Sequence, residues 1–473
     1  MENARSLYKN DVDFAALALQ SRDFAKYLKP KSQLDFSDPA AVRQLTTSLL
    51  EQDFHLKVEI PDDRLCPPVC TYINQRRSHA HALTLLAGTK QVCRRRVDTN
   101  VTPLCMTDEK ERLNYILWLQ DLLDSTTGEL KSGYDSSREV VGLDIGTGCI
   151  SIYPLLGCTS RPGWTFIATD IDSNNIYSAQ HNVQMNKLEH RIRVINTDAE
   201  GLLFPLNNLG HATLDFTMCN PPFYTSRDEL IQSAEQKSRP AFSACTGAEV
   251  EMVTRGGEVA FVKRMIEESL VLHDRIQWYT SMLGKLSSVS VLVEMLIQHD
   301  NHNYAVTEFV QGSKTKRWAL AWSWGDKRPI MTAARGIPGF PKHLLPFPAD
   351  YNFTLAPEIS IDTASAALNS ELDSLTWFWS WDQNASAGTG IAAENVWSRQ
   401  ARRKMKISGQ EGAGKLKDVP TQVHLGVRVY LRLLRGQKPE DKKVQVLVRW
   451  TQGTDSVLFE SFCGMVKRKL EAK

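Results

Sequence analysis

The chain has 473 residues, of which 42% are hydrophobic and 23% charged, and its formal net charge is +2. This length exceeds one ordinary domain, and the composition is that of a soluble globular protein rather than a disordered one. No stretch approaches ~18 uninterrupted apolar residues, so we expect no membrane span. The near-balanced charge neither demands nor excludes nucleic acid as a partner.

Helical patterns open the chain. Apolar residues recur at helical spacing over 13–28 and 38–54, with Asp38 as the expected N-cap of the second helix. Residues 68–109 then show no sustained period and are rich in Arg, His and Thr, so we interpret them as an insertion or long loop. The helical pattern returns at 111–125.

The nine cysteines are odd in number and scattered, and no apolar secretory run opens the chain. We therefore expect reduced thiols in a cytosolic or nuclear protein. One group of six side chains falls in or near 68–109, but it lacks the paired CxxC spacing of a zinc site, so we expect no metal. The group consists of Cys66, Cys70, His79, His81, Cys93 and Cys105.

From Val140 onward, short apolar runs alternate with helices. This rhythm predicts an α/β fold with a mostly parallel sheet, helices on both faces and an antiparallel edge hairpin. The expected strands are 140–146, 165–172, 191–198, 214–220 and 276–283, the helices 174–188, 258–273 and 288–299, and the hairpin 305–312 with 317–324.

The last third of the chain has a different organisation. Residues 326–370 lack a clear period, and we interpret them as a linker. Two strand patterns, at 423–434 and 444–452, and an amphipathic helix at 456–470 then predict a small α+β domain over 371–473.

Polar residues stand where four successive strands end. Asp144, followed by two glycines, ends the first strand, and Asp170, Asp198 and Asn220 end the next three. The glycines alone fit an ordinary βα turn equally well, and the third glycine of a dinucleotide fingerprint is missing. Because ligands bind at the carboxyl ends of parallel strands, the four ends together favour a ligand site, with Asp170 placed to accept both hydroxyls of a ribose.

The corner Asn220-Pro221-Pro222-Phe223 has its own chemistry. Two prolines fix the backbone and remove two donors, so the corner is stiff. The Asn220 amide oxygen and the Pro221 carbonyl then offer two acceptors for one planar NH2 group, and Phe223 offers a face on which a base can stack. An amine held in this way can attack an electrophilic methyl group without a strong base.

Residues 144–148 and 220–223 resemble the class I, Rossmann-like S-adenosylmethionine-dependent methyltransferases that act on amino groups. Further segments in order, among them 38–54, 111–123 and 256–270, resemble the methyltransferase-like 16 family, and the chain looks like a fungal-type member. That family methylates adenosine N6 in structured RNA, including the U6 small nuclear RNA, and is related to the bacterial large-subunit ribosomal RNA adenine-N6 methyltransferase F. The resemblance covers roughly residues 8–325 apart from 68–109.

The resemblance implies a seven-stranded Rossmann-like sheet, S-adenosylmethionine as co-substrate, no metal, and structured RNA as partner. Where the family has a donor-contacting serine after the glycines, this chain has Ile150, with Ser151 beside it. The donor-binding residues that it implies are Arg112, Asp144, Gly146, Gly148, Ser151, Asp170, Asp198, Gly201 and Asn220. The catalytic residues are Asn220, Pro221, Pro222 and Phe223, and the expected RNA-binding residues are Lys314, Lys316, Arg317, Arg402 and Arg403.

The expected organisation follows from pattern and resemblance together. The polar segment 225–258, directly after the corner, is expected to cover the substrate.

Family membership implies the nucleus, the cytoplasm or both, while the oligomeric state stays open between a monomer and a weak dimer. The expected segments are an RNA-facing helical extension (1–67), an insertion or translated intron (68–109), the methyltransferase domain (110–325), the linker (326–370) and an auxiliary RNA-binding domain (371–473).

Two other functions stay open. Protein glutamine N5-methyltransferases use a similar Asn-Pro-Pro-aromatic corner, although the basic hairpin around Lys316 and the long family match favour RNA. An RNA-binding regulator with dispensable catalysis is the second, and the intact set of Asp144, Asp170 and Asn220 argues against it.

Overall fold

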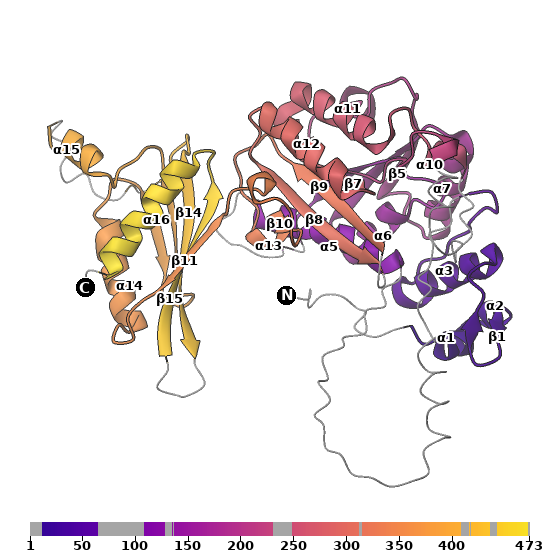
Figure 1. Ribbon diagram of the computed structural model, residues 1–473, viewed down its shortest axis with the longest axis horizontal. Coiled ribbons are helices and arrows are strands. Elements are labelled where there is room, and N and C mark those ends of the chain that lie inside the picture. The colour runs from indigo at the N-terminus through magenta and orange to yellow at the C-terminus, as the bar shows by residue number, and fades with distance from the viewer. Residues whose placement is uncertain are drawn as a thin grey trace, which may run out of the picture. The chain divides into compact units, whose positions relative to one another are not determined.

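A computed structural model gives the fold (Figure 1). The insertion apart from its last two residues, the cysteine–histidine group, Lys314 and most of the segment 225–258 lie outside the described residues. The structure describes residues 12–64, 108–127, 135, 137–229, 248–311, 315–407, 416, 418–435 and 442–471.

The larger sheet has eight strands in the order β10-β8-β9-β7-β6-β3-β4-β5. Five consecutive strands of this order, β7, β6, β3, β4 and β5, pair in parallel, which confirms the predicted α/β fold. The strands are β3 (Val140–Ile145), β4 (Trp164–Asp170), β5 (Ile192–Asn196), β6 (Leu214–Cys219), β7 (Ile276–Leu283), β8 (Tyr304–Gln311), β9 (Thr315–Trp322) and β10 (Arg335–Gly336).

The eighth strand differs from the expected seven. β10 pairs in parallel with β8 at Val306 and Thr307. Two residues are too few to show any period in a sequence, which is why the pattern missed this strand. β8 and β9 are neighbours joined by residues 312–314, a link so short that only an antiparallel pair allows it.

Helices connect these strands. α5 (Asp108–Ser125) precedes β3, and Ser151 precedes α6 in a left-handed conformation with φ of 56°. The other connecting helices are α6 (Ile152–Ser160), α7 (Ser173–Met185), α8 (Leu206–Leu209), α10 (Glu249–Met252), α11 (Gly257–Leu272), η1 (His273–Arg275) and α12 (Leu286–Gln298).

The N-terminal extension is helical, as predicted, and has its own small core. It contains α1 (Phe14–Gln20), α2 (Arg22–Ala25), the short pair β1 (Leu28–Lys29) and β2 (Gln33–Leu34), and α3 (Pro39–Phe54). Asp38 caps α3, because its Oδ1 accepts the amide of Ala40 at 2.9 Å. The core residues are Phe14, Leu17, Phe24, Val42, Leu45 and Leu49.

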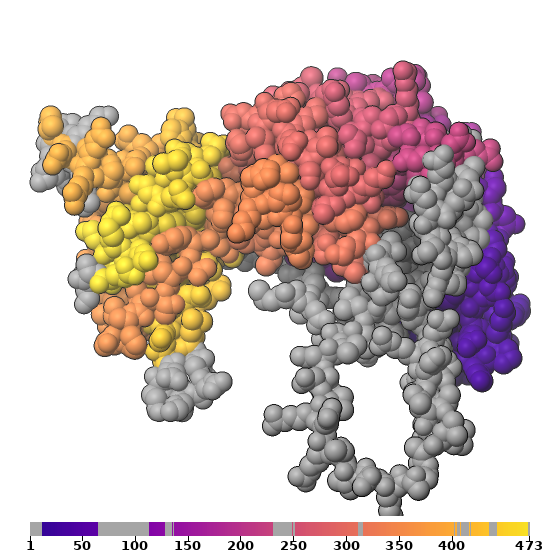
Figure 2. Space-filling view, viewed as in Figure 1, coloured from indigo at the N-terminus to yellow at the C-terminus, as the bar shows by residue number. Residues whose placement is uncertain are grey.

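The smaller sheet is antiparallel, in the order β11-β15-β14-β13-β12. α14 and α16 pack side by side over one face of it, and Figure 2 shows both helices at the surface. The core beneath them includes Trp377, Trp379 and Phe462. The elements are β11 (Asp350–Thr354), α14 (Ile361–Asp373), β12 (Phe378–Asp382), β13 (Ala387–Ala392), α15 (Arg399–Ile407), β14 (Leu425–Arg435), β15 (Lys442–Gln452) and α16 (Ser456–Glu471).

Residues 326–370, expected as a linker, are largely structured. They hold α13 (Met331–Ala334), β10, η2 (Lys342–Leu344), β11 and the start of α14, and they bury Phe340 and Phe353. Elements of two to five residues show no period, so the sequence pattern resembled a linker. By compactness the chain divides into two units, Met1–Leu119 with Ser136–Met295 and Glu308–Ala321, and Gln120–Asp135 with Leu296–Thr307 and Trp322–Lys473.

Candidate active site

A cavity of about 600 Å³ lies at the carboxyl ends of β3, β4 and β6. This volume is typical of small-molecule sites. Of the residues expected at the site, Gly146, Gly148, Asp170, Asp198, Asn220, Pro221 and Pro222 line it. The lining comes from 145–150, 152–153, 169–171, 175, 197–200, 202–203, 219–222, 251, 253–255, 260–261 and 264.

The loop after β3 forms one wall of the cavity. Gly146 and Gly148 have φ of 71° and 66°, which glycine adopts without strain. Apart from the chain neighbours, no atom of the described residues lies within 4 Å of where their Cβ atoms would stand. Open space in front of two glycines is what a bound molecule close to the backbone requires. Asp144 lies behind this wall: its Oδ2 accepts the Thr147 hydroxyl at 2.7 Å, and that hydroxyl lies 3.0 Å from Ser151 Oγ.

Asp144 and Ser151 are therefore loop-holding residues in this structure. Both are buried, and neither is among the described residues that line the cavity. Gly201 is also outside the lining, although its neighbours on both sides belong to it. Arg112 lies in α5, and its side chain is outside the described part of the chain.

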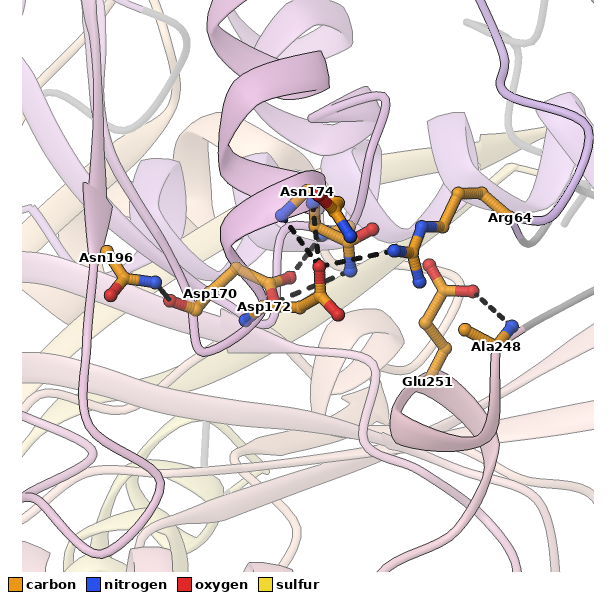
Figure 3. Close-up of polar contacts among 9 residues, drawn as sticks. Arg64, Asp170, Asp172, Asn174, Asn196, Ala248 and Glu251 are labelled. Carbon is orange, nitrogen blue, oxygen red and sulfur yellow. Dashed lines mark hydrogen bonds and ion pairs between the residues drawn. The ribbon is translucent and has the colours of Figure 1, made fainter.

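Asp170 is the buried carboxylate of the cavity (Figure 3). Its Oδ2 accepts the amide of Gly148 at 2.9 Å, and its Oδ1 accepts the amide of Asp172 at 2.9 Å and the Asn175 side chain at 3.5 Å. Burial raises the pKa of Asp170, and the amide hydrogen bonds only partly oppose that rise. The group is thus fixed in orientation at the end of β4, where a ribose can meet it.

Arg64 reaches this loop from the N-terminal extension. Its guanidinium is buried and lies 3.4 Å from Oδ1 of Asp172, which also caps α7. Figure 3 shows Arg64 pointing toward Asp172 from a different segment, with Glu251 of α10 nearby. The sequence analysis missed Arg64, because a pair separated by 108 positions leaves no local signal.

The corner after β6 holds an unsatisfied acceptor. Asn220 is half-buried, and within the described ranges its buried Oδ1 finds no hydrogen-bond partner. Such an acceptor costs free energy unless a ligand donates to it. Since Cys219, Pro221 and Pro222 line the cavity with it, the Oδ1 atom suits the N–H of an incoming amine.

Phe223 stands next to the corner and is partly buried. The guanidinium of Arg317 lies 5.0 Å from the centre of its ring, within the range of a cation–π contact. A Cβ at Gly284 would lie 3.1 Å from Phe223 Cδ1, so Gly284 packs closely against the ring.

The other expected RNA-binding residues come from two segments, Lys316 from β9 and Arg402 and Arg403 from α15. Lys316 of β9 pairs with Glu308 at 3.1 Å. Arg403 is exposed on α15, whereas Arg402 lies on the same helix with its side chain outside the described residues. Within the described part of the chain, no three His, Cys, Asp or Glu side chains are grouped to hold a metal ion. No helix there is long and apolar enough to cross a membrane.

The strand order β5-β4-β3-β6-β7-β9-β8, with glycines after the first strand and a carboxylate after the second, defines a Rossmann-like class I methyltransferase fold. The sequence profile of an RNA methyltransferase family matches residues 2–107 and 104–326. The chain belongs to this RNA methyltransferase family, which confirms the resemblance seen in the sequence.

Two relatives illustrate the match. The U6 small nuclear RNA (adenine-(43)-N(6))-methyltransferase of Schizosaccharomyces pombe is 31% identical over 93% of this chain and 95% of its own. The mouse RNA N(6)-adenosine-methyltransferase METTL16 is 38% identical over 68% of this chain, which spans about half the length of that relative (51%).

A solved structure matches the same part of the chain. The catalytic domain of human METTL16 in complex with hairpin 1 of the MAT2A 3′UTR is 35% identical and covers 68% of this chain and 95% of that one, with a TM-score of 0.52. The same domain with hairpin 6 gives a TM-score of 0.51.

Proposed function

We propose that this protein transfers a methyl group from S-adenosylmethionine to N6 of an adenosine in a structured RNA. The observation that carries the proposal is the Oδ1 of Asn220, which has no hydrogen-bond partner among the described residues and lies in a stiff Pro-Pro corner beside a cavity with a buried, oriented Asp170. The names of the relatives and the hairpin complexes support the same reaction.

The cavity has the features that the methyl donor needs. Gly146 and Gly148 leave room for the methionine part, Asp170 accepts the ribose hydroxyls, and the loop from Asp198 flanks the adenine. Asp144 and Ser151 support this site from behind the glycine wall.

The corner then positions the acceptor. Asn220 Oδ1 and the Pro221 carbonyl accept the two N–H bonds of the adenine amino group, and Phe223 stacks on the base. The donor supplies an electrophilic methyl carbon on a sulfonium. When the nitrogen lone pair forms the new C–N bond, the C–S bond breaks with its electron pair going to sulfur, and an N6 proton passes to water.

A labelling experiment tests the reaction class. Purified full-length protein is incubated with methyl-labelled donor and total RNA, and the RNA is digested to nucleosides. We expect label in N6-methyladenosine. Label in protein would favour the glutamine N5-methyltransferase alternative, and RNA binding without label would favour the regulator.

We further propose an auxiliary RNA-binding domain, expected over 371–473 and extended by the smaller sheet back to β11, and a nuclear site of action in keeping with U6-type substrates. In β14, Val427, Val429 and Leu431 point into the core under α14 and α16, so Arg428, Tyr430 and Arg432 face the other way.

This second face of the smaller sheet combines charge and an aromatic ring. The guanidinium groups of Arg428, Arg432 and Arg449 lie 5.4, 5.2 and 5.8 Å from the centre of the Tyr430 ring. Arg449 is held by two hydrogen bonds to Asp350, of 2.7 and 2.9 Å. An aromatic ring can bind a base by stacking, and the cations around it can bind phosphates by charge. We therefore propose this face as an RNA contact in addition to Arg402 and Arg403.

A further inference from the structure

α11 contacts both sides of the proposed reaction centre. Its first turn carries Glu258, close to the corner that holds the acceptor. About two and three turns later it carries Arg264 and Glu268, beside the loop that flanks the donor. From Glu258 to Arg264 the helix rises by roughly 9 Å at 1.5 Å per residue. One rigid element therefore joins two segments that have to meet within bonding distance.

At the donor end, Arg264 and Glu268 hold the loop 198–204 by its backbone. Arg264 donates to the carbonyls of Gly201 and, at 3.5 Å, of Ala199. Glu268 Oε2 accepts the amides of Leu203 at 2.8 Å and Phe204 at 3.2 Å.

The two side chains also hold each other in position. Arg264 Nε donates to Glu268 Oε1 at 3.1 Å. The loop needs this support, because Asp198, Ala199 and Glu200 are exposed and line the cavity.

At the acceptor end, Glu258 is a buried carboxylate with three donors. It accepts the amide of Gly284 at 2.5 Å, the amide of Lys285 at 3.1 Å and the hydroxyl of Ser288 at 2.5 Å. These donors lie at the start of α12. Since Gly284 packs against the ring of Phe223, Glu258 fixes the surface on which that ring rests.

We propose that α11 sets the spacing between donor and acceptor, with Arg264 and Glu268 positioning the donor loop and Glu258 positioning Phe223. This inference rests on the proposed function. In-line transfer depends steeply on distance, and a displacement of about 1 Å can cost ~100-fold in rate. The two ends of one helix thus have separable effects.

The experiment separates donor binding from turnover in the full-length protein. Affinity for S-adenosylmethionine is measured by calorimetry without RNA, and kcat is measured with a saturating substrate hairpin. For Arg264→Ala we expect a donor Kd raised about tenfold and, at saturating donor, kcat within about threefold of the wild type. Arg264→Lys, which keeps one donor toward the carbonyls, should recover part of the affinity.

For Glu258→Gln we expect the opposite pattern: kcat lowered about tenfold and the donor Kd within about twofold. Gly284→Ala, whose Cβ would lie 3.1 Å from both Glu258 Oε2 and Phe223 Cδ1, disturbs the same contact from the other side and should lower kcat in the same way. The matched control is Lys263→Ala, since Lys263 forms the neighbouring exposed i,i+4 pair with Glu267 at 3.8 Å and should change neither quantity.

Equal losses of affinity and kcat in Arg264→Ala and Lys263→Ala would overturn the proposal, because general loosening of α11 would explain them. An unchanged donor Kd in Arg264→Ala would overturn the role of Arg264 and Glu268 in positioning the donor loop. An unchanged kcat in both Glu258→Gln and Gly284→Ala would overturn the role of Glu258 in positioning Phe223. If the wild type binds donor but methylates no RNA, the proposed function fails while the calorimetric arm still tests Arg264.

Discussion

At the scale of single residues, Asn220 is the side chain on which turnover depends most. Asn220→Ala removes the acceptor that orients the amine, so we expect kcat to fall by at least ~100-fold, the usual cost of losing one such polar contact in the transition state. The donor Kd should stay within about threefold, since Asp170 and the glycine loop remain. Single-turnover methylation of a hairpin and calorimetry with the donor measure the two quantities, and near-wild-type turnover would contradict the role of Asn220.

Asp170 has opposite preferences in folding and in donor binding. Its pKa is raised above 3.8 by burial, so the folded state favours the protonated form. Relative to Asp170→Asn, the wild type should therefore be most stable below pH ~4 and lose that advantage as pH rises through the raised pKa.

Donor affinity should increase as pH rises, because only the ionised carboxylate accepts both ribose hydroxyls. Donor affinity of the wild type is expected to fall on acidification through the same pKa, while Asp170→Asn binds weakly at every pH. Denaturant unfolding and calorimetry across this range measure both trends, and parallel pH profiles would refute the assignment.

At the scale of elements, α7 holds the N-terminal extension through two asparagine side chains, each of which hydrogen-bonds both the amide and the carbonyl of one residue, as a neighbouring β-strand would. Asn182 accepts the amide of Glu59 at 2.7 Å and donates to its carbonyl at 3.0 Å, and Asn186 does the same for Lys57 at 2.9 and 2.7 Å. The Asn182 side chain is fully buried and also donates to the carbonyl of Cys149.

We therefore expect Asn182→Ala to lower the free energy of unfolding by about 2–4 kcal/mol, since it leaves the buried carbonyl of Cys149 and the partly buried backbone groups of Glu59 unpaired. Asn186→Ala, in a more exposed copy of the same arrangement, is the internal control, with a loss of about 1 kcal/mol. Chemical denaturation measures both, and equal losses would show that burial does not set the cost.

The same elements show how far the sequence can be interpreted. Strand ends, glycine turns and the Asn220 corner are local patterns, so the fold and the cavity residues at the strand ends were predictable, whereas the lining residues between Glu251 and Arg264 were not. Arg264 and Glu268 show an i,i+4 pair in the sequence, but nothing local reveals the loop that they hold. The contact of Asn182 with Glu59 spans 123 positions and needs the fold itself.

At the scale of the whole molecule, RNA affinity should depend on the Tyr430 face of the smaller sheet as well as on the catalytic edge. Arg432→Glu should weaken hairpin binding about tenfold at low salt and reduce the slope of log affinity against log salt concentration by about one, because one phosphate contact is lost. Tyr430→Ala should weaken binding with little change in that slope, since stacking releases no counterions.

The matched control is Lys467→Glu, which makes the same change in net charge on α16, on the helix-covered side, where Lys467 is paired with Glu471 at 3.8 Å. Donor affinity should be unchanged in all three variants, and the unfolding temperature shows that each is folded at the assay temperature. Fluorescence anisotropy of a labelled hairpin at several salt concentrations measures the effect. If Lys467→Glu and Arg432→Glu weaken binding equally, net charge rather than this face of the sheet attracts the RNA.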